Sequence, residues 1–133
     1  MRKVTQGHRL GCAVACTAAM LDLNYKQALA LFPNGNIRAR KEGFYGKDII
    51  LALQYGKLEY IFNHTTEETE IPEGSIVFVK RSDHYPAGHY LALSKRGWMD
   101  PWINFPKYPR VSGFREKLPG IPQFIVSPKQ IDL

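Results

Sequence analysis

The sequence predicts an α+β fold in which N-terminal helices pack on a C-terminal antiparallel sheet. Helical patterns fill the first half of the chain, and strand patterns separated by tight turns fill the second half. The length of 133 residues suits one domain, and the composition, 44% hydrophobic and 23% charged, is typical of a globular protein. We therefore expect residues 1–133 to form a single domain.

Three helices are expected in the first half. Residues 12–21 are small or apolar at almost every position, which is typical of a helix buried on most sides. Asn24 and Gln27 have the spacing of a capping box that opens a helix through residues 28–32. Residues 37–44 are expected to form a basic loop, and residues 46–55 the third helix.

Strands are expected in the second half, where apolar and polar residues alternate or β-branched residues cluster. Residues 101–122, rich in proline and aromatic side chains, are expected to form an ordered irregular loop. A tight turn at residues 95–97 predicts a hairpin between the third and fourth strands. The expected strands are residues 58–62, 75–79, 88–94, 98–100 and 123–126.

Neither a membrane segment nor a secretory leader is expected. The longest apolar stretch, residues 12–21, is half of the roughly 20 residues that a membrane helix needs. The basic start, residues 1–3, continues into polar residues instead of an apolar core. Cys12 and Cys16 lie one helical turn apart, where geometry does not favour a disulfide. These features predict a cytoplasmic protein in a reducing compartment.

Cys12 has the sequence position of a nucleophile. It follows Gly11 and opens a helix, so unpaired backbone N–H groups and the positive end of the helix dipole favour its thiolate. Cys16 lies one turn deeper in an apolar helix, where desolvation favours the neutral thiol. The alternative for either residue is an inert buried thiol.

Three other side chains are candidates for the same chemistry. The Gln6 carboxamide, with the backbone N–H of Cys12, could stabilise an oxyanion. His89 opens a strand that would hold it rigidly as a general base. Asp100 ends the next strand, but a turn at residues 96–97 pairs it near Ser94. Only a shifted register or a bend at the following proline then brings it to His89.

The order of Gln6, Cys12, His89 and Asp100 along the chain resembles that in the bacteriocin-processing papain-like cysteine peptidases. These double-glycine leader peptidases are best known as the N-terminal domain of bacterial peptide-exporting ABC transporters. The motifs that carry the resemblance are Gln6-x5-Cys12, Gly88-His-Tyr-Leu-Ala-Leu and Trp98-Met-Asp-Pro, within a match over roughly residues 3 to 126.

The resemblance implies a papain-like fold and a thiol hydrolase that acts on a peptide or protein without a cofactor or metal. Cys12 would be the nucleophile and His89 the general base and acid. Asp100 would orient the imidazole, and Gln6 would build the oxyanion hole. The chain departs from the family in having Ala13 instead of glycine after the cysteine and a short, eleven-residue interval from histidine to aspartate. With no transporter segments, a stand-alone bacterial or phage domain is expected, and double-glycine specificity is not carried over.

Two alternatives keep this fold. An acyltransferase or deamidase would use the same acyl-enzyme, which an amine rather than water would resolve. A non-catalytic peptide-binding module would keep the fold without the chemistry. The presence of all four residues, Cys12, His89, Asp100 and Gln6, argues against that module.

Two further alternatives rest on composition. A zinc site could be assembled from Cys12, Cys16, His84 and His89, but this spacing matches no standard zinc motif. A formal charge of +6 permits a nucleic-acid partner, yet no nucleic-acid-binding motif is present.

Overall fold

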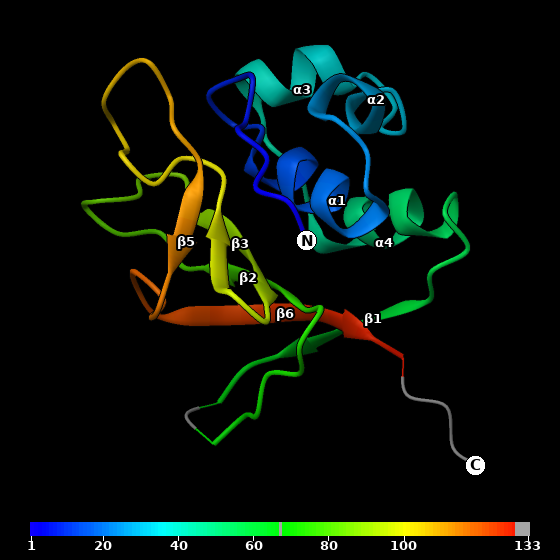
Figure 1. Ribbon diagram of the computed structural model, residues 1–133, viewed down its shortest axis with the longest axis vertical. Helices are drawn as coiled ribbons and strands as arrows, with labels where there is room; N and C mark the ends of the chain where they lie inside the picture. The colour runs from blue at the N-terminus through cyan, green and yellow to red at the C-terminus, as the bar shows by residue number, and fades with distance from the viewer. Residues whose placement is uncertain (67, 130–133) are drawn as a thin grey trace.

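The computed structural model describes residues 1–66 and 68–129, and it confirms the α+β class. Within these residues, four helices lie beside a six-stranded antiparallel sheet (Figure 1). The helices are α1 (Cys12–Leu21), α2 (Tyr25–Leu29), α3 (Gly35–Lys41) and α4 (Gly46–Gln54). The strands are β1 (Tyr60–His64), β2 (Ile76–Val79), β3 (His89–Ser94), β4 (Gly97–Asp100), β5 (Gly113–Arg115) and β6 (Pro122–Pro128), in the sheet order β1-β6-β2-β3-β4-β5.

Helix α1 is the central element of the helical layer, as its apolar sequence predicts. Residues 12–19 are all buried, and the helix contacts α2, α4 and β3. Its alanines allow these neighbours to approach closely, while Thr17 satisfies its hydroxyl by donating to the Ala13 carbonyl at 2.8 Å. None of the helices in the described part of the chain is long and apolar enough to cross a membrane.

The helical half differs from expectation at two places. The capping box of Asn24 and Gln27 is present, but α2 ends at Leu29 instead of Phe32. Residues 37–44 are not simply a basic loop, because α3 extends through Lys41. Arginine, alanine and lysine all favour helix, and this short helix exposes Arg40 and Lys41, buries Ala39 and pairs its half-buried Arg38 with Asp48 at 2.7 Å.

The strand half contains one strand that the sequence analysis missed. Strand β5 lies within residues 101–122, where the abundance of proline and aromatics predicted only loop. Strand β1 begins two residues later than expected, and β6 extends further because both of its neighbours, β1 and β2, pair along it. The hairpin between β3 and β4 has its two-residue turn at residues 95–96.

The two faces of the sheet carry different side chains, because neighbouring residues of a strand point to opposite faces. Tyr90 and Ala92 of β3 belong to the core cluster that includes α1 and α4. Leu91 belongs to a second cluster, with Val77 and Trp98, on the opposite face. By alternation His89 starts β3 on the face of Leu91, at the end of the strand that α1 approaches.

We predict that Gly11→Ala destabilises the fold. A Cβ atom on Gly11 meets the hydroxyl of Tyr25, which is half-buried and hydrogen-bonded to His8 at 2.9 Å. We expect the free energy of unfolding to fall by about 1–3 kcal/mol, the usual cost of overpacking, as measured by urea denaturation. Adding Tyr25→Phe removes the clashing oxygen and should recover part of the loss. Equal stability of Gly11→Ala and the wild type would contradict the predicted clash.

Candidate active site

Cys12 is the first residue of α1 and lies at the bottom of a cleft. It is 9% exposed and is one of the residues that line the cleft. The backbone N–H of Tyr90 donates a hydrogen bond to Cys12 Sγ at 3.4 Å. Together with the unpaired N–H groups of the first helical turn, this bond gives the sulfur a surrounding of backbone donors. The sequence predicted the helical contribution but gave no signal for Tyr90.

His89 and Asp100 form a buried pair. His89 Nε2 and Asp100 Oδ1 are 2.7 Å apart, and neither side chain is more than 4% exposed. The backbone N–H of Trp102 donates to the same Asp100 oxygen at 2.9 Å. These bonds fix both the carboxylate and the plane of the imidazole ring.

The hairpin register explains how Asp100 reaches His89. Ser94 pairs with Gly97, so the turn lies one residue earlier than the sequence analysis assumed. Asp100 thereby moves two positions along β3 and comes opposite Leu91 if the register continues. His89 is then its diagonal neighbour on the same sheet face, within reach of a side-chain hydrogen bond. Of the two routes expected to bring Asp100 to His89, the structure has the shifted register, and no bend at Pro101 is needed.

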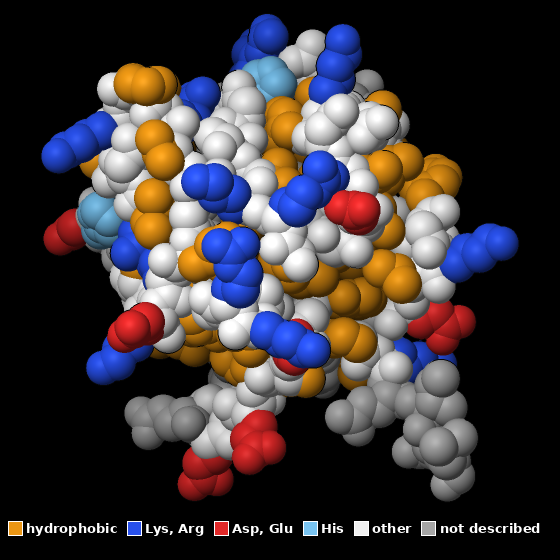
Figure 2. Space-filling view, viewed as in Figure 1, with side chains coloured by type: hydrophobic (Ala, Val, Ile, Leu, Met, Phe, Trp, Pro, Cys, Tyr) orange, Lys and Arg blue, Asp and Glu red, His pale blue; other side chains and the backbone are white. Residues whose placement is uncertain are grey.

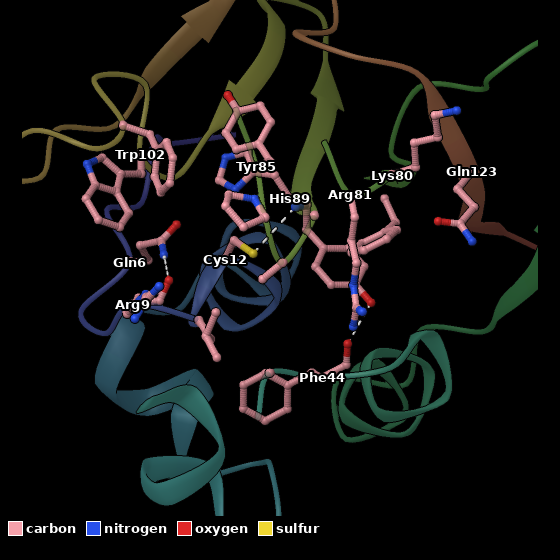
Figure 3. A pocket seen from close by; sticks show the side chains of 18 of the residues that line it. Gln6, Arg9, Cys12, Phe44, Lys80, Arg81, Tyr85, His89, Trp102 and Gln123 are labelled. Carbon is pink, nitrogen blue, oxygen red and sulfur yellow. Dashed lines mark hydrogen bonds between the residues drawn. The ribbon is translucent and has the colours of Figure 1, made fainter. Parts of the chain in front are cut away.

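The other side of the imidazole faces Cys12 (Figure 3). Because Nε2 is bonded to Asp100, Nδ1 is the ring nitrogen left to interact with the Cys12 side chain. Burial alone would lower the pKa of His89, but the hydrogen bond to Asp100 and the interaction with Cys12 outweigh it and raise the pKa to about 9. Asp100 is also buried, yet its bonds to His89 and to Arg115 hold its pKa below the usual value. An imidazolium flanked by a carboxylate and a sulfur is the resulting arrangement at neutral pH.

Two features of the loop before β3 fix the imidazole further. Gly88 has φ of +75°, and a Cβ atom there would meet the Phe78 ring, so this position requires glycine. Tyr85 stacks on His89 with ring centroids 4.7 Å apart and an interplanar angle of 6°. Tyr85 is itself buried, and it shields the imidazole from solvent. No local sequence pattern predicts this stacking.

Gln6 lies beside Cys12 in the cleft, but its amide hydrogens are occupied. Gln6 Nε2 donates to the backbone carbonyls of His8 and Arg9, both at 3.0 Å. Its Oε1 is buried without a hydrogen-bond partner among the described residues. The structure therefore brings Gln6 to the predicted place, with its donors held by the chain segment that leads into α1.

The cleft has a volume of about 730 Å³ and lies between the helical segment and the sheet. Figure 3 shows Cys12 and His89 in its middle, Gln6 and Trp102 on one side, and Lys80, Arg81 and Gln123 on the other. The cleft thus extends away from the sulfur in two directions, which suits a chain-like ligand. The aromatic residues Tyr45, Tyr85 and Trp102 are among those that line it. Trp98 lies in the core.

The zinc-site and nucleic-acid alternatives depend on how the cysteine, histidine and basic side chains are arranged. Cys16 is a free, fully buried thiol in the core, and burial raises its pKa well above the usual value. No group of three or more potential metal-ligating side chains (His, Cys, Asp or Glu) occurs in residues 1–66 and 68–129. On the face shown in Figure 2, lysine and arginine side chains are dispersed among neutral and apolar surface rather than gathered in one stripe.

Comparisons with known proteins add no assignment. Searches of family models, of curated proteins and of solved structures found no match to this chain. Any function must therefore be argued from the cleft and the side chains that it brings together.

We predict that stability falls as the pH rises from about 6.5 to 9. Folded His89 has a pKa of about 9, against 6.5 for an ordinary histidine, so the folded chain binds this proton more tightly. The stabilisation that this proton provides is complete below pH 6.5 and is lost by about pH 9. Its loss lowers the free energy of unfolding by up to about 3 kcal/mol. Asp100, with a lowered pKa, contributes in the opposite sense, above its usual value of 3.8.

Urea denaturation at a series of pH values measures this dependence. The wild type should lose stability across the alkaline range, and His89→Gln should lose much less. Parallel pH curves for the two proteins would contradict the raised pKa of His89.

Proposed function

We propose that this protein is a thiol hydrolase of papain-like architecture that cleaves a peptide or amide bond through an acyl-enzyme. The observation that carries the proposal is the position of His89, which is hydrogen-bonded to the buried carboxylate of Asp100 and lies beside Cys12 in the same cleft. A helical layer with the cysteine at a helix N-terminus, and a sheet that supplies the histidine, is the arrangement that such architecture requires. The resemblance of the sequence motifs supports the same proposal.

The reaction begins from a Cys12 thiolate and a His89 imidazolium. The sulfur attacks the carbonyl carbon, a C–S bond forms, and the carbonyl electrons move to oxygen as an oxyanion. When the C–N bond breaks, His89 gives its proton to the leaving amine, and an acyl-enzyme remains. Neutral His89 then takes a proton from water, which attacks the thioester. The acid product leaves and the thiolate is restored.

Asp100 keeps the imidazole in the orientation that both steps need. It is fully buried and accepts from His89 Nε2, so the proton that moves in catalysis is the one on Nδ1, facing Cys12. Tyr85, stacked on the ring, excludes water from this pair. An ion pair kept dry in this way interacts more strongly than one in water.

The oxyanion would be stabilised by the backbone N–H of Cys12 and by Gln6. Gln6 is 2% exposed and lies beside the nucleophile, but both of its amide hydrogens bond to backbone carbonyls. We infer that a developing oxyanion, which is a stronger acceptor than a neutral carbonyl, draws one of these hydrogens from His8 or Arg9. Gln6 then acts only once charge has developed on the substrate.

We predict that iodoacetamide modifies Cys12 selectively in the native protein. At pH 6 the Cys12 adduct should form at least about 100 times faster than the adduct of buried Cys16, because only Cys12 is paired with an imidazolium. His89→Gln should slow modification of Cys12 by about tenfold or more. Mass spectrometry of tryptic peptides measures both rates.

The same experiment extends to turnover. Cys12→Ala should abolish cleavage of peptides in a mixed peptide library, whereas Cys16→Ala, the matched control in the same helix, should retain it. Added amine distinguishes hydrolysis from acyl transfer by the mass of the product. The proposal would be contradicted if Cys12 of the native protein reacted with iodoacetamide no faster than a thiol of the unfolded chain.

We predict that Gln6→Ala lowers kcat on a cleaved library peptide by about 10- to 100-fold, with KM changed less than about threefold. An interaction made only with the oxyanion affects the chemical step and not the binding of substrate. Gln123→Ala, an exposed glutamine in the same cleft, is the control and should leave kcat unchanged. A rise in KM at constant kcat would assign Gln6 to substrate binding instead.

A further inference from the structure

The Asp100 carboxylate has a third hydrogen-bond partner, Arg115, that the sequence analysis did not identify. Arg115 Nε donates to Asp100 Oδ2 at 2.7 Å, while Oδ1 accepts from His89. A second guanidinium nitrogen, Nη2, donates to the backbone carbonyl of Ile103 at 3.1 Å. Arg115 is 27% exposed and Asp100 is fully buried, so the guanidinium covers the carboxylate at the solvent side.

The sheet register places Arg115 there by the same geometry that places His89. Asp100 pairs with Gly113 and Trp98 pairs with Arg115, so Arg115 is the diagonal neighbour of Asp100 on β5. His89 is its diagonal neighbour on β3. The three side chains therefore form a row across three adjacent strands, with the carboxylate between two cations.

This row has a consequence for the proton on His89. A buried carboxylate with no other partner would hold the imidazolium very strongly, and general acid catalysis requires that proton to be released to the leaving amine. Arg115 shares the negative charge of Asp100 and repels the positive charge of His89. Both effects make the imidazolium easier to deprotonate than it would be beside Asp100 alone.

We propose, on the basis of the proposed function, that Arg115 is a positioning residue that holds the Asp100 carboxylate and sets the pH at which the His89 imidazolium loses its proton. It acts through Asp100 and does not touch the substrate. The charge, and not only the hydrogen bond, is essential to this role.

Few other groups near this row can change charge below pH 9. From α1, Cys12 faces His89, and Cys16 has a pKa raised well above the usual value by burial. From the loop before β3, Tyr85 has a pKa raised to about 12 by burial, and on β3 itself burial keeps Tyr90 neutral. His84 packs edge-on against Tyr85, and no hydrogen bond or ion pair joins it to Asp100 within the described chain. The alkaline transition of the site therefore belongs to the pair of His89 and Cys12, and the NMR shift of the His89 ring follows the histidine within that pair.

The test compares Arg115→Gln, Arg115→Lys and the wild type in the full chain. Two readouts follow pH: the rate of Cys12 modification by iodoacetamide, and the NMR chemical shift of the His89 ring, assigned by its loss in His89→Gln. Lys117→Gln removes an exposed cation two residues away and is the matched control. Neither readout needs an identified substrate.

We expect Arg115→Gln to move the alkaline transition upward by about 0.5 to 1 pH unit, because one nearby cation is lost. Arg115→Lys keeps the charge and should stay within about 0.3 of a unit of the wild type, although the lost bond geometry slows modification at every pH. Lys117→Gln should match the wild type. If Arg115→Gln does not fold, Arg115→Lys decides, because a transition moved by more than this margin contradicts the charge-based role.

A lower stability of Arg115→Gln with an unmoved alkaline transition would overturn the inference and leave Arg115 as a structural residue. That result differs from failure of the proposed function, in which the wild type itself shows no fast modification of Cys12. The inference about Arg115 is contradicted in that case as well. The wild-type measurement then shows that the proposed function, and not the role of Arg115 alone, has failed.

Discussion

The contact between the start of α1 and the start of β3 is the constraint on which the rest of the site depends. Strand β3 presents the Tyr90 backbone N–H to the Cys12 sulfur, and it carries His89 one residue earlier. Because α1 is buried along residues 12–19, it cannot shift without disturbing the core. The Tyr90 hydroxyl bonds to the Phe44 carbonyl and so ties the strand to the segment before α4. The separation of sulfur and imidazole is therefore set by core packing, not by a flexible loop.

Asp100 couples this site to the stability of the sheet. A fully buried carboxylate is costly unless its oxygens are satisfied, and here His89, Trp102 and Arg115 all donate to it. The burial that would raise its pKa is outweighed by these bonds, so the carboxylate stays ionised. The same bonds join strands β3, β4 and β5 through their side chains. Loss of any partner thus affects both the order of the sheet and the chemistry of the imidazole, which is why charge-preserving and charge-removing substitutions must be compared.

Much of this arrangement could be predicted from local sequence patterns. The apolar run of α1, the capping box of α2 and the β-branched β2 each follow from short-range rules, and they placed Cys12 and His89 at element starts. The resemblance predicted that Asp100 orients His89, but the strand register that brings them together could not be predicted, because moving a turn by one residue changes the register by two. Arg115 was missed for a related reason: β5 has only three residues and follows a proline-rich segment, so nothing local marks it as a strand. Residues that are brought together only by strand pairing have no recognisable local sequence pattern.

On the proposed mechanism, the hydrogen bonds of Gln6 make its interaction with a substrate depend on the charge of the acceptor. Its two amide hydrogens stabilise the chain that leads into α1, and the exchange of a backbone carbonyl for an oxyanion breaks one of these bonds. Such an exchange is favourable only for an acceptor with substantial negative charge, since a neutral substrate carbonyl offers no more than the carbonyl it replaces. The interaction is then realised in the transition state and not in the bound substrate, which is the condition for raising kcat. A glutamine with free amide hydrogens would also bind the neutral carbonyl of the substrate. The difference between its binding of the transition state and of the substrate would then be smaller.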